Sequence, residues 1–232
     1  MVQQLTLDIE PKVAYSRYDF LVLPENEHIM RVLEDTSLWK SHCLILCGEK
    51  GSGKTHLAHI FADLYKGKSL IMNAHDVREE TIPVLVSKYK YIVLENAGEG
   101  VPEINLFHLF NFAKDEGVKL LITAEKPFTE WGLERRDLYT RLATVMVLRI
   151  PEPTDEMMTA LLTKMFADKQ IYVADEVFSY IITHTERSFK SIRNIVERAD
   201  KLSLQEKRKI TVPLIKKVVA EIGENSGLLL PL

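Results

Sequence analysis

Residues 48–55 read "GEKGSGKT", and the fold of this chain follows from them. The stretch fits the pattern G-x-x-x-x-G-K-[ST] at every defined position. It lies between the apolar run "HCLILC" (42–47) and the amphipathic run "HLAHIFADLY" (56–65). A strand that leads into such a loop and a helix that leaves it form the context that a phosphate-binding loop requires. We therefore expect a P-loop α/β fold that binds a nucleotide.

Each residue type of the loop has a physical role in holding phosphates. The glycines let the backbone N–H groups approach the phosphate oxygens, and the N-terminus of the following helix adds further N–H groups. Lys54 is expected to reach the β and γ phosphates, and Thr55 to ligate Mg²⁺. His56 and His59 lie on one face of the next helix without a further ligand nearby, so packing or solvation is preferred over a metal pair. The expected nucleotide-binding residues are Gly48, Gly51, Ser52, Gly53, Lys54 and Thr55.

Apolar runs alternate with helical patterns on both sides of the loop. Because continuous apolar strands separated by helices are typical of parallel sheets covered on both faces, we predict an αβα core with a five-stranded parallel sheet. The expected strands are 42–47, 69–73, 91–95, 119–124 and 143–150, and the expected helices are 56–65, 76–88 (interrupted by Pro83) and 103–117.

The strands stop at Pro151-Glu152-Pro153, and only helical patterns follow. Thr154 is a plausible N-cap, with two acids in the first turn after it. These patterns predict a small helical bundle with helices at 154–168, 174–184, 188–206 and 211–222. The predicted organisation is a tail at 1–15, the nucleotide-binding α/β domain at 16–152, the helical domain at 153–223 and a second tail at 224–232.

Composition narrows the class of protein. The 232 residues carry a formal net charge of -3 and a pI near 6.2. This charge argues against a surface whose main role is to coat nucleic acid. The two cysteines, Cys43 and Cys47, lie in an apolar run and are interpreted as buried thiols in a reducing cytosol. Neither a signal peptide nor a membrane-spanning run is visible, so a cytoplasmic protein without membrane contact is expected.

A second site element follows the P-loop by about 40 residues, in "YIVLENAGEG" (91–100). A nucleotide hydrolase would normally end such a strand with Asp and then Glu, one for Mg²⁺ and one to activate water. Here Glu95 takes the first position, and Asn96, which cannot accept a proton, takes the second. The strand predicts a site that binds nucleotide with Mg²⁺ through Glu95 but has at most weak intrinsic ATPase activity.

Longer segments resemble a known family. The P-loop, "YIVLEN", "LFHLFNFAKDEGVKLLITAEKP" and "DLYTRL" occur in the order found in AAA+ ATPases of the DnaA branch. The resemblance is closest to the Hda-type proteins, a DnaA-related group that acts in the regulatory inactivation of DnaA. It extends from Gln4 to about Val219. "LEN" replaces the family's "IDN", so the missing catalytic Glu follows the Hda pattern, whereas Glu95 in place of Asp does not.

The resemblance implies further site residues. Thr123 is similar to sensor I, which lies near the γ-phosphate. Arg141 in "DLYTRL" is placed like an arginine finger, which stabilises charge on a phosphoryl group bound by a neighbouring subunit. The resemblance also implies that the helical domain at 153–223 is a lid over the nucleotide and that Arg193 is placed on it like sensor II. The entry segment "YDFLVLPENEHIM" implies three neighbours of the adenine, namely Leu21, Val22 and Asn26.

The N-terminal "QLTLDI" (4–9) is similar to the family's clamp-binding hexapeptide. An extended peptide of this kind can insert apolar side chains into a groove on the DNA polymerase III β sliding clamp. The residues that keep the family's types are Gln4, Leu5, Leu7 and Ile9. Asp8 replaces a proline, which removes some preorganisation of the peptide.

Two classes of function remain open. In the first, the protein is a nucleotide-bound regulator that is tethered to the clamp and presents Arg141 to ATP on DnaA. The family suggests ADP as the working ligand, with ATP as the alternative, and sequence-specific DNA binding is not expected because no helix-turn-helix domain follows the lid. In the second, the protein is an AAA+ loader or remodelling ATPase of the replication machinery, similar to helicase loaders. Whether it forms a homo-oligomer is left open.

Overall fold

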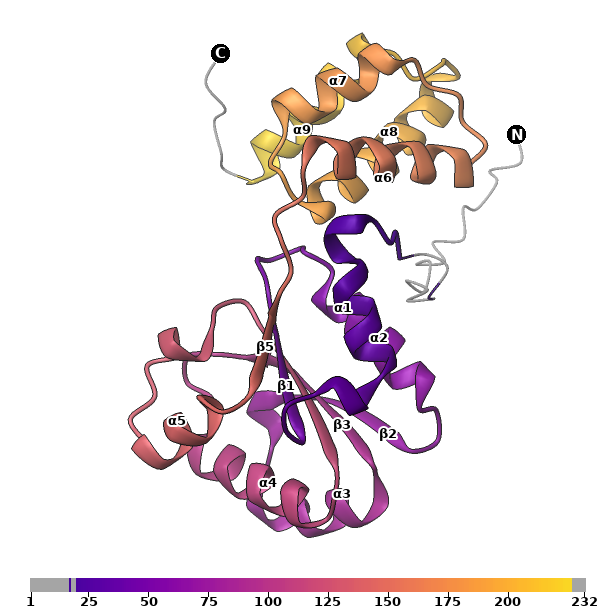
Figure 1. Cartoon of the computed structure of the whole chain (residues 1–232). Helices are drawn as coiled ribbons and strands as arrows, with labels where there is room; N and C mark the ends of the chain where they lie inside the picture. Colours follow the sequence, from indigo (N-terminus) through magenta and orange to yellow (C-terminus); the bar gives the residue numbers. More distant parts are fainter. Residues whose placement is uncertain (1–16, 18–19, 227–232) are drawn as a thin grey trace, which may run out of the picture.

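A computed structural model describes residue 17 and residues 20–226 of the chain (Figure 1). The clamp-like hexapeptide with Gln4, Leu5, Leu7 and Ile9 lies outside the described residues, as does the end of the chain from 227. Within the described part, no helix is long and apolar enough to cross a membrane.

The core is a five-stranded, all-parallel sheet in the order β2-β3-β4-β1-β5, as the sequence predicts. Strand β1, which leads into the P-loop, lies between β4 and the edge strand β5, so its carboxyl end has neighbours on both sides. The strands are β1 (Cys43–Cys47), β2 (Ser69–Asn73), β3 (Tyr91–Ala97), β4 (Lys119–Ala124) and β5 (Met146–Arg149).

Helices cover both faces of the sheet and make a three-layer core. One face packs against α1 (Pro24–Glu34) and α2 (Lys54–Leu64) through an apolar cluster that includes Leu44, Phe61 and Val93. The other packs against α3 (Ile82–Lys88), α4 (Glu103–Asp115) and α5 (Arg136–Leu142). Because β1 and β4 are buried on both faces, their sequences are continuous apolar runs rather than alternating ones.

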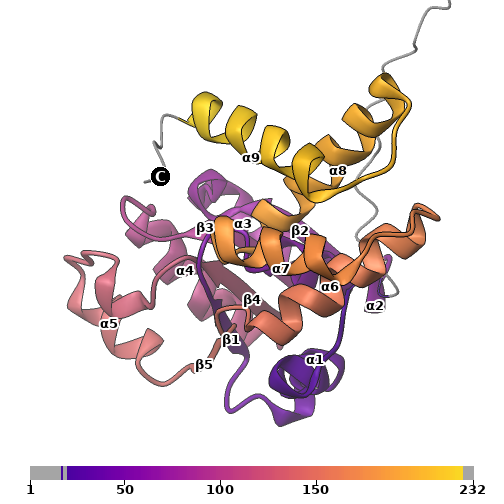
Figure 2. The same ribbon diagram turned by 90° about the horizontal axis from the view of Figure 1, so that it is seen from above.

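The lid is a separate helical bundle that follows β5 and lies over the carboxyl ends of the strands (Figures 1 and 2). Its helices are α6 (Asp155–Asp168), α7 (Asp175–His184), α8 (Phe189–Glu206) and α9 (Val212–Ser226). They share an apolar cluster of their own that includes Leu162, Ile181 and Leu214. The Oγ1 atom of Thr154 accepts a hydrogen bond of 3.2 Å from the N–H of Met157, which confirms the predicted N-cap of the first lid helix.

Several boundaries differ from the sequence prediction by one or two residues, and the following four differences bear on how an element is interpreted. Strand β3 does not end at Glu95 but continues to Ala97 through an irregularity in its pairing with β4. Strand β5 begins at Met146 rather than 143, because the preceding residues close helix α5. Pro83 lies in the first turn of α3, where its missing N–H is harmless, so it opens this helix instead of interrupting one. Helix α9 continues to Ser226, beyond the predicted end at 222.

Candidate functional site

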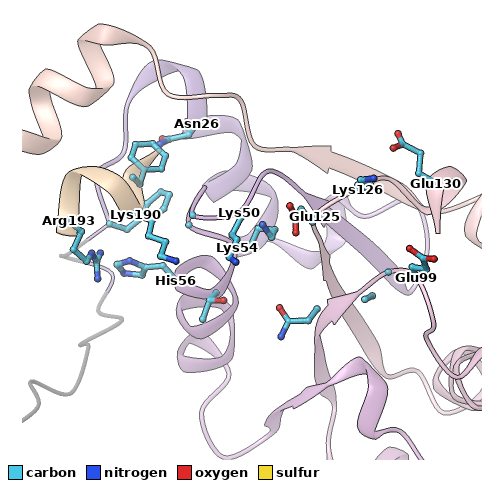
Figure 3. A pocket seen from close by; sticks show the side chains of 18 of the residues that line it. Asn26, Lys50, Lys54, His56, Glu99, Glu125, Lys126, Glu130, Lys190 and Arg193 are labelled. Carbon is cyan, nitrogen blue, oxygen red and sulfur yellow. The ribbon is translucent and has the colours of Figure 1, made fainter. Parts of the chain in front are cut away.

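A cavity of about 720 Å³ lies between the P-loop, the carboxyl ends of β3 and β4, and the lid. We call it the main pocket, and its volume lies within the usual range for small-molecule sites. Figure 3 shows Lys190 and Arg193 extending from the lid beside His56, with Glu99 and Glu130 at the other end. Eight residues predicted from the sequence line it, namely Leu21, Asn26, Gly51, Gly53, Lys54, Thr55, Asn96 and Arg193. The pocket therefore brings together residues as far apart in the chain as Leu21 and Arg193.

The P-loop has the backbone geometry that its glycines allow. Gly53, with φ 96°, is the N-cap of α2, so the helix starts directly at Lys54. The Lys54 Nζ atom donates hydrogen bonds to the carbonyl oxygens of Gly48 (2.6 Å) and Glu49 (2.7 Å), which holds the ammonium within the loop. Burial lowers the pKa of Lys54, whereas the nearby Glu125 carboxylate acts in the opposite direction. A phosphate placed here would meet a fixed positive charge and the N-terminus of an 11-residue helix.

Gly51 marks a point of contact between the loop and the lid. Its φ is 84°, and a Cβ atom added there would lie 2.7 Å from Cβ of Lys190 on α8. No side chain can occupy that space without moving the lid or the loop. A Cβ atom at Gly48 would likewise meet the Ser52 Oγ atom at 2.6 Å, and Ser52 itself is buried. Gly48 and Ser52 thus pack within the loop and do not line the main pocket.

The magnesium candidates come from two different elements. Thr55 lies in the first turn of α2 and lines the main pocket. Glu95 lies opposite Asn73 in the pairing of β3 with β2. Side chains alternate along a strand, so Glu95 shares the face of Val93, which is the face that α2 covers. Its Oε1 atom is buried and has no hydrogen-bond partner among the described residues. A buried carboxylate oxygen left unpaired is chemically suited to a cation or to the water shell of one.

Asn96 and Thr123 are adjacent in space. Asn96 has φ 58° and lines the main pocket, because the irregularity in β3 turns it away from the ladder. Its backbone N–H donates a hydrogen bond of 3.3 Å to Oγ1 of Thr123, which is buried on β4. The sequence-predicted sensor residue is therefore tied to the end of the neighbouring strand.

The entry segment before α1 is held by Asn26. Its Oδ1 atom accepts a hydrogen bond from the N–H of Leu23 (2.9 Å), and its Nδ2 atom donates one to the carbonyl of Leu21 (3.0 Å). Both the oxygen and the nitrogen of the side-chain amide thus bind backbone groups. Asn26 therefore stabilises the wall of the pocket, and its amide is not directed at a base. Val22 does not line the main pocket and packs against the apolar cluster under α1.

Arg141 lies elsewhere, on the short helix α5. Its guanidinium is 5.1 Å from the centre of the Phe107 ring, an arrangement typical of a cation–π contact. It lines a second cavity of about 520 Å³, together with His42, Lys114 and Thr140. In the part of the chain that the structure describes, Arg141 does not border the main pocket.

The structure adds residues to the main pocket that the sequence did not single out. Glu125 follows Thr123 by two residues, and its carboxylate acts to raise the pKa of Lys54. Lys190 precedes Arg193 by one helical turn and so shares its face of α8. His56 is buried, and its ring packs edge-on against the ring of Phe20 with 5.4 Å between the ring centres. This contact supports the prediction that His56 has a packing role and is not a metal ligand. The position of Glu125 at a strand end was a usable signal, whereas the approach of the lid was not visible in the sequence.

Comparisons with known proteins agree with this architecture. The model of the family described as "Hda, lid domain" matches residues 155–219. An uncharacterized protein of Haemophilus influenzae is 29% identical over 205 residues, covering 80% of this chain and 85% of that protein. The replication initiator DnaA of Wolinella succinogenes is 27% identical over 197 residues, covering 77% of this chain and 45% of that protein. The chain thus spans less than half the length of the DnaA relative.

Solved structures show the same fold. Domain III of DnaA from Thermotoga maritima matches with a TM-score of 0.76 at 15% identity, over 89% of this chain and 96% of that one. The AMPPCP-bound DnaA from Aquifex aeolicus matches with a TM-score of 0.67 at 16% identity, over 81% of this chain and 67% of that one. At these identities the likeness concerns the fold, an α/β core with a helical lid.

Proposed function

The chain is a DnaA-related AAA+ protein of the Hda type, and from this premise we propose that it is a nucleotide-bound regulator of replication initiation that acts on DnaA. In this proposal the protein holds ADP or ATP in the main pocket and supplies Arg141 to ATP bound by DnaA. Hydrolysis then takes place on DnaA, which loses its active form. The relatives named DnaA support the choice of partner.

The observation that carries the proposal is the separation of Arg141 from the protein's own pocket. Arg141 borders a cavity on the α4–α5 side of the core, whereas Lys54 and Thr55 border the main pocket. An arginine that does not reach the nucleotide of its own subunit can act on a nucleotide held by another. The cavity beside Arg141 offers room for part of a partner to approach the guanidinium.

The protein's own site supports retention of nucleotide more than turnover. Lys54 and the N-terminus of α2 would bind the phosphates, with Arg193 and Lys190 approaching from the lid. Thr55 and Glu95 would hold Mg²⁺, which would neutralise phosphate charge when bound. Asn96 can orient a water molecule but cannot take its proton, so the water-activating group of a hydrolase is missing at this position.

Tethering through the N-terminal hexapeptide completes the proposal. Gln4, Leu5, Leu7 and Ile9 would insert into the groove of the β sliding clamp. The tether would restrict DnaA inactivation to DNA that already carries a clamp, which links the regulator to ongoing replication.

The decisive experiment compares Arg141→Ala with wild-type protein in a DnaA-bound ATP hydrolysis assay that contains clamp loaded on DNA. We expect the variant to bind ADP as tightly as the wild type and to lose stimulation by about 10³-fold, the usual order for a finger arginine. Arg136→Ala, an exposed arginine on the same helix, is the matched control and should keep stimulation. Equal stimulation by wild type and Arg141→Ala would refute the finger, and rapid hydrolysis without DnaA would favour the alternative, an AAA+ loader.

A further inference from the structure

Three lysines lie side by side at the amino ends of three adjacent strands. The backbone N–H of Lys90 donates to the carbonyl of Lys68 at 2.8 Å, and the N–H of Lys119 donates to the carbonyl of Lys90 at 2.9 Å. Adjacent strands are about 4.8 Å apart, so the three residues form a slanted row across the sheet. Lys119 lies opposite Tyr91, one position beyond Lys90, and its side chain therefore leaves the other face of the sheet. The next position in the row, in front of β1, is His42, whose carbonyl accepts from Leu120 at 2.8 Å.

Further lysines surround this row. The segments that lead into β1, β2, β3 and β4 are 39–42, 65–68, 88–90 and 114–119, and together they contain seven lysines and only two acids, a formal charge of +5. Because the four strands are parallel, all four segments meet at one edge of the sheet, the edge opposite the main pocket. The lysines outside the row are Lys40, Lys66, Lys88 and Lys114, all exposed. We call the seven residues the lysine edge.

The cations of the lysine edge are not neutralised within the described part of the chain. None of the seven forms a salt bridge there, although lid lysines such as Lys164 and Lys169 do, with Asp168 and Asp200. The Nζ atom of Lys119 instead donates to the carbonyls of Thr36 (3.2 Å) and Ser41 (3.3 Å), which positions the ammonium without removing its charge. Like charges on neighbouring strands are destabilising, so this arrangement weakens the fold slightly unless an anion binds.

We propose that the lysine edge binds the phosphate backbone of double-stranded DNA without reading its sequence. The row from Lys68 to Lys119 spans two strand spacings, about 10 Å, which corresponds to about three axial steps between successive phosphates of one DNA strand. Lysine ammonium groups are suited to phosphate contacts that position a protein on DNA but carry no sequence information.

Other partners fit the edge less well. Lysine is depleted from protein–protein interfaces, so an acidic protein is disfavoured. Single-stranded nucleic acid needs aromatic rings that are free to stack on bases. Two of the aromatic rings near the edge are already engaged, since Tyr65 stacks on Tyr91 at 3.6 Å and Trp39 is buried against Phe61. Phe112, beside Lys114, is exposed. The net charge of -3 for the whole chain concealed this edge, because it averages the edge with acidic surfaces elsewhere.

The location of the edge has a functional consequence. The main pocket lies at the carboxyl ends of the strands and the lysine edge at their amino ends, so DNA and nucleotide can be bound at the same time. Contact with duplex DNA would add a second attachment for a protein that works beside replicating DNA. It does not depend on Arg141 or on the N-terminal hexapeptide.

The test measures binding of the full-length protein to a fluorescent 20-base-pair duplex by anisotropy, over a series of salt concentrations and without DnaA or clamp. We expect a dissociation constant of about 10⁻⁴–10⁻⁶ M near physiological salt, which tightens steeply as salt is lowered. The triple variant Lys68→Gln/Lys90→Gln/Lys119→Gln should weaken binding at least tenfold at low salt and reduce the slope of log K against log salt by about 2.7, which is 0.9 for each lost phosphate contact.

The matched control is Lys201→Gln/Lys209→Gln/Lys216→Gln, which removes the same charge from exposed positions of the lid. It should keep the wild-type affinity and slope. Circular dichroism and nucleotide binding report whether the row variant is folded. Absence of duplex binding at low salt, equal losses in both triple variants, or binding only to single strands or to vesicles of phosphatidylcholine with phosphatidylglycerol would each overturn the proposal. Because the assay contains no DnaA, its result is independent of the arginine finger.

Discussion

The backbone N–H of Asn96 donates a hydrogen bond of 3.3 Å to the side-chain oxygen of Thr123, across the ends of β3 and β4. This contact exists because β3 is irregular between Leu94 and Ala97, which places Asn96 in the left-handed region at φ 58°. The hydroxyl of Thr123 accepts from Asn96 and keeps its own proton free to donate. The pair thus presents an amide and a hydroxyl, both neutral, where a hydrolase would present a carboxylate.

The conformation of Asn96 can be tested by stability. Asparagine tolerates the left-handed region better than most residues, and glycine tolerates it without steric penalty. We expect Asn96→Ala to lower the free energy of unfolding by about 1 kcal/mol relative to Asn96→Gly. Urea denaturation at neutral pH measures the difference. If the two variants were equally stable, position 96 would not be held in this conformation in solution.

Gly51 is predicted to be required for lid closure. Gly51→Ala would place a methyl group 2.7 Å from Cβ of Lys190, so the lid must move away from the P-loop. Gly67→Ala is the matched control, since Gly67 has nearly the same φ of 83° but open space around it. Both variants carry the backbone strain of an alanine at positive φ, whereas only Gly51→Ala should weaken binding of a fluorescent ADP analogue, by tenfold or more. Equal nucleotide affinities would show that the lid contact is dispensable.

Glu95 is expected to couple nucleotide binding to Mg²⁺. Glu95→Gln removes the negative charge and keeps the size of the side chain. The variant should lose most of the gain in ADP affinity that Mg²⁺ gives the wild type, as measured by calorimetry. Glu99→Gln, an exposed change at the pocket, should keep this gain. A wild-type response in Glu95→Gln would remove this residue from the metal site.

His42 should make stability depend on pH. Burial lowers the pKa of His42, and the hydrogen bond to the Phe110 carbonyl acts in the opposite direction. The charges of Lys114, Lys119 and Arg141 add to the lowering of this pKa. The unfolded chain, with a histidine pKa near 6.5, therefore binds a proton more readily than the folded protein. The free energy of unfolding should thus fall as pH drops below about 6.5. His42→Gln should flatten this fall between pH 7 and 5, whereas His28→Gln, an exposed histidine on α1, should not. If the free energy of unfolding fell with pH equally steeply in His42→Gln and His28→Gln, His42 would not be the source of this pH dependence.

The hexapeptide is tested by gel filtration with purified sliding clamp. Gln4→Ala/Leu7→Ala removes the polar anchor and one apolar side chain of the peptide, so co-elution with the clamp should be lost. Substitution of Asp8 by Pro should strengthen binding, because proline restores a preorganised backbone. Unchanged co-elution of the double variant would exclude the tether but leave the role of Arg141 untouched.

Much of the fold was predictable because it depends on local patterns. The apolar runs at β1, β3 and β4 and the P-loop between a strand and a helix indicated a covered parallel sheet, which the structure confirms. The predicted end of β3 was wrong. The irregular pairing at Glu95 and Asn96 arises from contact with β4, which is distant in the sequence. Pro83 was misread because a proline signals a helix start as well as a break, and only the hydrogen bonds of the neighbouring turns distinguish them.

By itself the sequence determined the P-loop, the five parallel strands, the helical lid and the substitution of Asn96 for a catalytic carboxylate, because each is encoded in residues close together along the chain. Tertiary structure alone decided which distant residues meet. It brought Lys190 against Gly51, left the Glu95 oxygen unpaired, kept Arg141 away from the main pocket and gathered seven lysines at one edge. The reason is geometric, since parallel strands bring all their preceding segments to one edge and all their following segments to the other.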